Sequence, residues 1–140
     1  MKTALVMKTL LKFSLLLAAL LVCGTLRAQN EGNEVFVPIS KYLTQGNAES
    51  LSAWFADNLE ISVISPADNS SKSQAKQILK SFFDKYTPRS FEISHIAGKP
   101  NMKYALGSLT AGGENFNVTI FVSCKDDVYK IQQLKIERVQ

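Results

Sequence analysis

The chain has 140 residues, and its formal charge of +4 comes from 16 basic and 12 acidic residues. Four of the basic residues lie before residue 29, in a stretch without any acid, so the remaining 12 basic and 12 acidic residues balance. A balanced chain without a basic stripe lacks the electrostatic footprint of a nucleic-acid-binding protein, and that class of partner is excluded.

Residues 1–28 have the pattern of a secretory signal peptide. Lysines come first, an apolar run from Phe13 to Val22 is interrupted only by Ser14, and small residues lead to Ala28. The run has about ten residues, roughly half of what a bilayer core requires. We therefore expect export, cleavage after Ala28 and no stable membrane span afterwards. N-terminal sequencing of exported material should begin at Gln29.

The two cysteines lead to different expectations. Cys23 leaves open a lipoprotein, although the preceding Val22 is bulkier than the Gly, Ala or Ser that normally stands there. Cys124 is the one cysteine after residue 28, so no intramolecular disulfide can form. Because Cys124 continues the alternation of Val118, Ile120 and Val122, we expect it to face the core, with an exposed redox or dimerising thiol as the alternative.

The 112 residues that follow the leader suffice for one domain. We expect a flexible terminus over 29–33 and a single domain over 34–140. The spacing of apolar residues from Val35 to Leu43 predicts a helix that stops at Gly46. Asn47 then caps a short second helix, which we expect to bury Leu51, Trp54 and Phe55.

The third predicted helix is the clearest element of the chain. Ser71 and Gln74 have the spacing of a capping box at its start. Its apolar residues recur at intervals of three and four, which places them on one buried face: Ala75, Ile78, Leu79, Phe82, Phe83 and Tyr86. Lys76 is expected on the solvent side, and Thr87-Pro88 ends the helix.

Apolar residues that alternate with period two predict a strand over 59–63 and four more near 91–97, 101–110, 114–124 and 128–138. Residues 66–70 are rich in turn formers and are expected to form a turn. The joints between the last four strands are short, which favours antiparallel hairpins. In the last strand the apolar residues fall out of phase, so we expect a bulge near Gln132-Gln133.

The order α-α-β-α-β-β-β-β, the segment Phe55-Ala56-Asp57-Asn58 and a closing strand from Tyr129 to Ile136 together resemble the nuclear transport factor 2-like superfamily. The resemblance implies an α+β fold in which three helices pack on a curved antiparallel sheet to form a cone. The spacing of Ile39, Gly46-Asn47 and Phe55–Asn58 behind a signal peptide is also similar to a family of small exported Bacteroidetes proteins, domain of unknown function 4783. This resemblance implies a location in the periplasm or outside a Gram-negative cell.

The resemblance places a ligand pocket at the open end of the cone, and a small apolar molecule is the ligand that such a pocket would suit. Seven residues are candidates for its lining: Tyr42, Trp54, Phe55, Phe82, Tyr86, His95 and Tyr104. It also implies a homodimer through the outer face of the sheet. Because fold does not choose a function, we expect a non-enzymatic binding or accessory domain, with a small isomerase or dehydratase as the alternative.

Chemical motifs give this enzyme alternative little support. Asp57 lies near the place of a catalytic base in the isomerases of the superfamily, but we expect it to cap a turn. His95 is the single histidine and lies on a predicted strand, so we expect no catalytic pair with Asp57. No metal-ligand spacing, nucleophile elbow or phosphate-binding glycine loop is present in the sequence, and no cofactor is expected.

Overall fold

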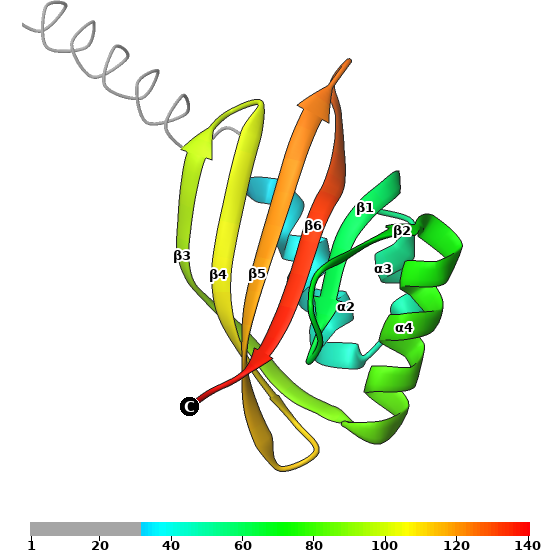
Figure 1. Cartoon of the computed structure of the whole chain (residues 1–140). Helices are drawn as coiled ribbons and strands as arrows, with labels where there is room; N and C mark the ends of the chain where they lie inside the picture. Colours follow the sequence, from blue (N-terminus) through cyan, green and yellow to red (C-terminus); the bar gives the residue numbers. More distant parts are fainter. Residues whose placement is uncertain (1–31) are drawn as a thin grey trace, which may run out of the picture. The chain divides into compact units, whose positions relative to one another are not determined.

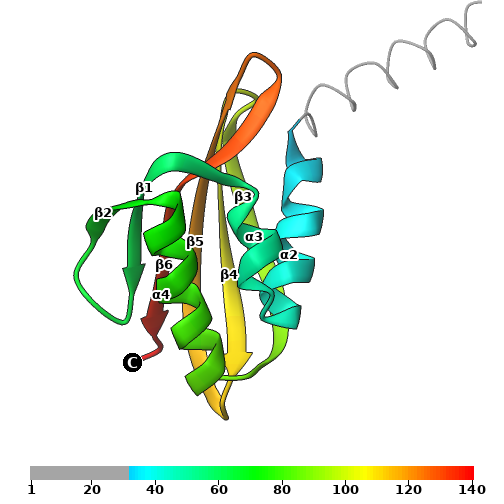
Figure 2. The same ribbon diagram turned by 90° about the vertical axis from the view of Figure 1, so that its right-hand side faces the viewer.

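The computed structural model describes residues 32–140, so the predicted signal peptide, Cys23 and residues 29–31 lie outside the described residues. Three α-helices lie on one face of a curved, open six-stranded sheet (Figures 1 and 2). The elements are η1 (Asn33–Val35), α2 (Phe36–Gln45), α3 (Ala48–Ser52), β1 (Phe55–Val63), β2 (Asp68–Ser71), α4 (Lys72–Lys85), β3 (Pro88–Lys99), β4 (Met102–Ala111), β5 (Glu114–Lys125) and β6 (Val128–Arg138). No helix in this part of the chain is long and apolar enough to cross a membrane.

Local sequence signals account for the end of α2 and the start of α3. Gly46 adopts φ 65°, and the N–H groups of Gly46 and Asn47 donate to the carbonyls of Leu43 and Tyr42. This is the Schellman arrangement, which ends a helix at a left-handed glycine. The Asn47 side chain then accepts a hydrogen bond from the Ser50 N–H at 3.0 Å, so the predicted cap is confirmed. Helix α3 ends at Ser52, before the predicted Trp54 and Phe55, and Phe55 begins strand β1.

The predicted capping box of α4 is present. The Gln74 N–H donates to Ser71 Oγ at 3.2 Å, and the Ser71 N–H donates to Gln74 Oε1 at 3.1 Å. The buried face consists of Ala75, Leu79, Phe82 and Phe83. Ile78 does not belong to it, because 39% of its surface is exposed. The prediction was wrong for Ile78 because the buried face of α4 is narrower than the spacing of the helix's apolar residues suggested.

The strand order across the sheet is β2-β1-β6-β5-β4-β3. The predicted α+β class and helix-on-sheet architecture are confirmed, with two differences in detail. Strand β1 pairs in parallel with β6, whereas all other neighbours are antiparallel, so the sheet is mixed. The segment predicted as a turn over 66–70 contains strand β2, which pairs with β1 at the edge of the sheet. The apolar pattern did not reveal β2 because its residues are polar, and an edge strand exposes most of its side chains.

The bulge predicted in the last strand is confirmed. Phe121 on β5 pairs with Gln133 and the next residue, Val122, pairs with Ile131, so Gln132 is the extra residue. The extra residue restores the phase of β6, and Ile131, Leu134 and Ile136 are all buried.

Gly32 and Asn33, the first described residues, contact the end of the sheet at which the β3–β4 and β5–β6 turns lie. Gly32 is buried, and Asn33 Oδ1 accepts a hydrogen bond from the ammonium of Lys103, a buried residue of β4. The Tyr129 hydroxyl donates to the carbonyl of Pro100 at 3.1 Å in the same region. The chain therefore enters the domain beside the tips of the β3–β4 and β5–β6 hairpins.

Candidate functional site

The seven residues predicted to line a pocket lie in separate parts of the molecule. Phe82 and Tyr86 contact each other between α4 and the sheet, with ring centroids 5.2 Å apart. Tyr42 is half-buried on α2, while Trp54 and Phe55 lie where α3 leads into β1. His95 and Tyr104 are exposed on β3 and β4, with ring centroids 6.2 Å apart. The structure therefore does not gather the seven around one space.

Aromatic side chains fill the space between α4 and the sheet. The ring of Phe116 on β5 lies 5.2 Å from that of Phe82 and 5.3 Å from that of Tyr86, and both contacts are edge-to-face. Phe83 adds a further ring 5.7 Å from Phe82. Arg138 donates a hydrogen bond of 2.7 Å to the Tyr86 hydroxyl at the margin of this cluster. The protein's own aromatic rings thus pack tightly in the space between α4 and β5.

His95 and Asp57 lie on different strands of the sheet. Strands β3 and β1 are four positions apart in the strand order, which corresponds to roughly 15–20 Å across the sheet. Both side chains are exposed. Asp57 lies within strand β1 rather than in a turn, so the prediction that it caps a turn was wrong. Over residues 32–140 no three His, Cys, Asp or Glu side chains are grouped as a metal site.

Cys124, the free thiol, lies near the end of β5 opposite Tyr129. It is half-buried, whereas its predecessors in the alternation, Val118, Ile120 and Val122, are fully buried. The position is therefore intermediate between the predicted core residue and the exposed alternative.

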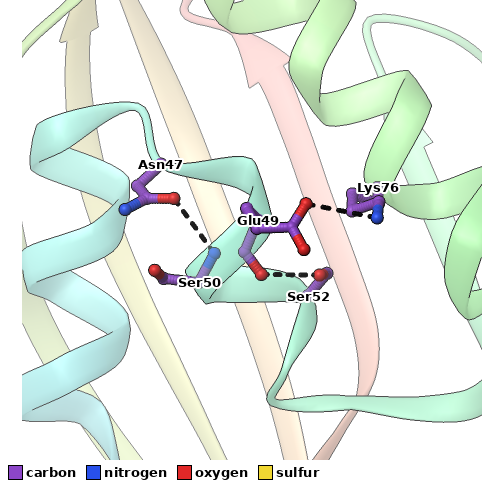
Figure 3. A network of polar contacts seen from close by, with 5 residues as sticks. All are labelled: Asn47, Glu49, Ser50, Ser52 and Lys76. Carbon is purple, nitrogen blue, oxygen red and sulfur yellow. Dashed lines mark hydrogen bonds and ion pairs between the residues drawn. The ribbon is translucent and has the colours of Figure 1, made fainter.

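A polar groove lies between α3 and α4. Glu49 Oε2 on α3 lies 3.2 Å from Lys76 Nζ on α4 and joins the two helices (Figure 3). The Ser52 hydroxyl donates to the Glu49 carbonyl at 2.7 Å, and the Asn47 cap stands at the start of the same helix (Figure 3). These short-range bonds order α3, so that its residues face α4 in a defined arrangement.

Two hollows adjoin the Glu49–Lys76 ion pair. One has a volume of about 480 Å³ and extends along α4 past Lys80 to Asp84. The other has about 430 Å³ and is lined by Glu49, Ser52, Ala53, Lys72, Ser73 and Lys76. Lys72, Lys76 and Lys80 follow one another at intervals of four residues, so all three project from the same side of α4.

A third hollow, of about 460 Å³, lies on the other side of Lys72. It is lined by Asp57 and its neighbours on β1 and by residues of the β5–β6 hairpin, among them Lys125, Asp126 and Lys130. The Lys130 ammonium donates to the carbonyl of Ala53 at 3.1 Å, which ties this hairpin to the end of α3. Lys72 is therefore shared between two hollows.

The outer face of the sheet has a different character. Met102, Tyr104 and Leu106 on β4 are exposed over 49%, 36% and 38% of their surface, and Phe121 on β5 pairs with Tyr104. Alternate residues of β4, such as Ala105 and Leu109, are buried on the helix side. This apolar stripe is bordered by polar residues of β4 and β5.

The α3–α4 groove was not predicted from the sequence. One signal was present, the spacing of Lys72, Lys76 and Lys80 at one lysine per helical turn, but such a spacing is equally typical of a solvated helix face. Glu49 and Ser52 are placed opposite these lysines only by the packing of α3 on α4, which no local pattern reports.

A family model described as Domain of unknown function (DUF4783) matches residues 36–137. A crystal structure of a DUF4783 family protein from Bacteroides ovatus is similar, with a TM-score of 0.70 and 21% identity over 74% of this chain and 94% of that one. A Bacteroides uniformis member of the family has a TM-score of 0.70 and 20% identity over 74% and 95%. No curated protein matches this chain.

A Streptomyces avermitilis protein of the NTF2-like family is also similar in structure. Its TM-score is 0.60, with 9% identity over 81% of this chain and 97% of that one. At such identities the likeness shows the fold alone, and that fold is NTF2-like.

Proposed function

This chain belongs to the DUF4783 family, a domain of unknown function with an NTF2-like fold, and on that premise we propose that it is a non-enzymatic binding or accessory domain that acts through its surface. The observation that carries this proposal is the closed interior. The resemblance places a substrate pocket inside the cone, and here Phe82, Tyr86 and Phe116 fill the space between α4 and β5 with their rings in contact.

The same packing bears on the apolar ligand predicted from the sequence. A molecule could occupy the space between α4 and β5 only if Phe82 or Tyr86 moved, and Tyr86 is held by the hydrogen bond from Arg138. The energetic cost of displacing packed rings is high because each ring would lose its contacts on one side. An apolar ligand in the cone therefore remains a prediction that the geometry disfavours.

We further propose that the domain works after export, in the periplasm or outside the cell. The leader pattern of residues 1–28 supports this proposal. The apolar stripe of Met102, Tyr104 and Leu106 supports a homodimer through the outer sheet face, because exposed apolar side chains on adjacent positions commonly mark an interaction surface.

Benzene provides a direct test of the closed interior. We expect the exported protein to show no saturable benzene binding when the NMR signals of its buried methyl groups are followed during a titration. Phe82→Ala removes the central ring and leaves an apolar cavity, and cavities of this kind bind benzene. The variant should therefore gain saturable binding.

Phe82→Leu serves as a milder second variant if the alanine variant does not fold. Saturable benzene binding to the unsubstituted protein, with shifts in residues around Phe116, would contradict the proposal and bring the enzyme alternative forward. Absence of binding to the unsubstituted protein together with binding to either variant would support it.

A further inference from the structure

Independently of how the interior is used, we propose that the hollow between α3 and α4 binds ligands that carry a carboxylate, phosphate or sulfate group. Lys72 and Lys76 are the residues that contact the anionic group. Glu49 competes with the ligand for the ammonium of Lys76.

Two of the three lysines in the α4 row have no direct ion pair in the described part of the chain. Lys72, Lys76 and Lys80 stand at like-charged i, i+4 spacing, which destabilises a helix on its own. Within residues 32–140, one lysine of this row forms an ion pair: Lys76, with Glu49. Lys72 and Lys80 have no carboxylate within 4.0 Å in the described part of the chain. An external anion would supply the direct ion pair that Lys72 lacks.

The hollow also has the shape and the donors for an anion. Its volume of about 430 Å³ accommodates a small organic acid or a phosphate ester, and its wall includes the exposed Ser73, whose side chain carries a hydroxyl. The side chain of Lys76 is only 29% exposed, so most of it packs against its surroundings beside the hollow. Ser73 belongs to the first turn of α4, where the helix dipole adds a favourable field for negative charge.

Glu49 shows that a carboxylate fits at this position. Its Oε2 atom lies 3.2 Å from Lys76 Nζ, yet the Glu49 side chain is 81% exposed (Figure 3). An ion pair with one partner in solvent contributes little to stability, so a ligand can replace the Glu49 carboxylate at small cost. Glu49 therefore acts as a weak internal competitor rather than as part of the binding group.

The proposal can be tested with citrate, inorganic phosphate and sulfate, each titrated into the exported protein at constant ionic strength and followed by NMR. We expect saturable shifts centred on Lys72, Ser73 and Lys76, with sodium chloride of equal ionic strength as the blank. Lys76→Gln and Lys72→Gln should each weaken binding about tenfold or more, because each removes one charge-assisted hydrogen bond. Glu49→Gln should strengthen binding several-fold, because the competitor is removed.

Lys41→Gln is the matched control, since Lys41 is an exposed lysine on α2 that lines neither of the two hollows. Its affinity for the three anions should be unchanged. The proposal is overturned if the shifts equal those of sodium chloride, if Lys41→Gln weakens binding as much as Lys76→Gln, or if Glu49→Gln leaves the affinity unchanged or lower.

Discussion

At the scale of single residues, Phe82 and Ile78 of α4 share the apolar spacing that predicts a buried position, but they differ in burial. Phe82 is 5% exposed and lies among three aromatic rings, whereas Ile78 is 39% exposed beside the β2 edge. Phe82→Ala should therefore lower the free energy of unfolding by about 3–5 kcal/mol. Ile78→Ala should lower it by less than about 1 kcal/mol, because little apolar surface is newly lost from the core.

Lys76→Ala is the comparison that separates charge from packing on the same helix. It breaks an ion pair with an exposed partner and should change the free energy of unfolding by less than about 1 kcal/mol. Urea unfolding of the three variants measures the ranking. A cost for Ile78→Ala equal to that for Phe82→Ala would mean that Ile78 is buried in solution.

At the scale of elements, two hairpin turns of the same backbone geometry contain different residues. Gly112 and Gly113 join β4 to β5 with φ 58° and 77°, and Asp126 and Asp127 join β5 to β6 with φ 53° and 61°. Both are two-residue turns with positive φ at each position, which favours glycine. Asp127→Gly should therefore stabilise the protein by up to about 1 kcal/mol and raise the melting temperature by a few degrees.

The reverse change tests the same cause at the other turn. A side chain at Gly113 meets open space, so Gly113→Asp should cost stability only through the backbone, by about the amount that Asp127→Gly gains. Asp127→Ala controls for the lost charge, because it removes the carboxylate but keeps a side chain at positive φ. Calorimetric melts in which Asp127→Ala stabilises as much as Asp127→Gly would show that charge repulsion, not backbone strain, is responsible.

At the scale of the whole molecule, the outer sheet face is the surface proposed to pair with a second copy. Leu106 belongs to the apolar stripe and lies near the middle of strand β4. Burying a charge there without a partner is costly, so Leu106→Asp should convert a dimer into a monomer in sedimentation velocity experiments. Val37→Asp places the same charge on an exposed apolar position of α2 and should leave the dimer intact. A protein that is monomeric without substitution at every accessible concentration would refute the dimer.

Much of the local structure follows from the sequence because its causes are local. The Asn47 cap, the Ser71–Gln74 capping box and the bulge at Gln132 each depend on residues within a few positions of one another. The candidate site was harder to predict. Its seven proposed residues came from a superfamily resemblance, and the structure places them on both faces of the sheet and at the α3–β1 junction.

The sequence by itself determined the class of the fold, the helices and their caps, the four long strands and the charge balance of the chain, because periodicity and capping act over one or two turns. Only the tertiary structure decided the parallel pairing of β1 with β6, the edge strand β2 and the exposure of Ile78. It also decided the filling of the interior by Phe116 and the meeting of Glu49 with Lys76. These features depend on contacts between distant segments, and such contacts are selected by how whole surfaces pack rather than by any neighbouring residue.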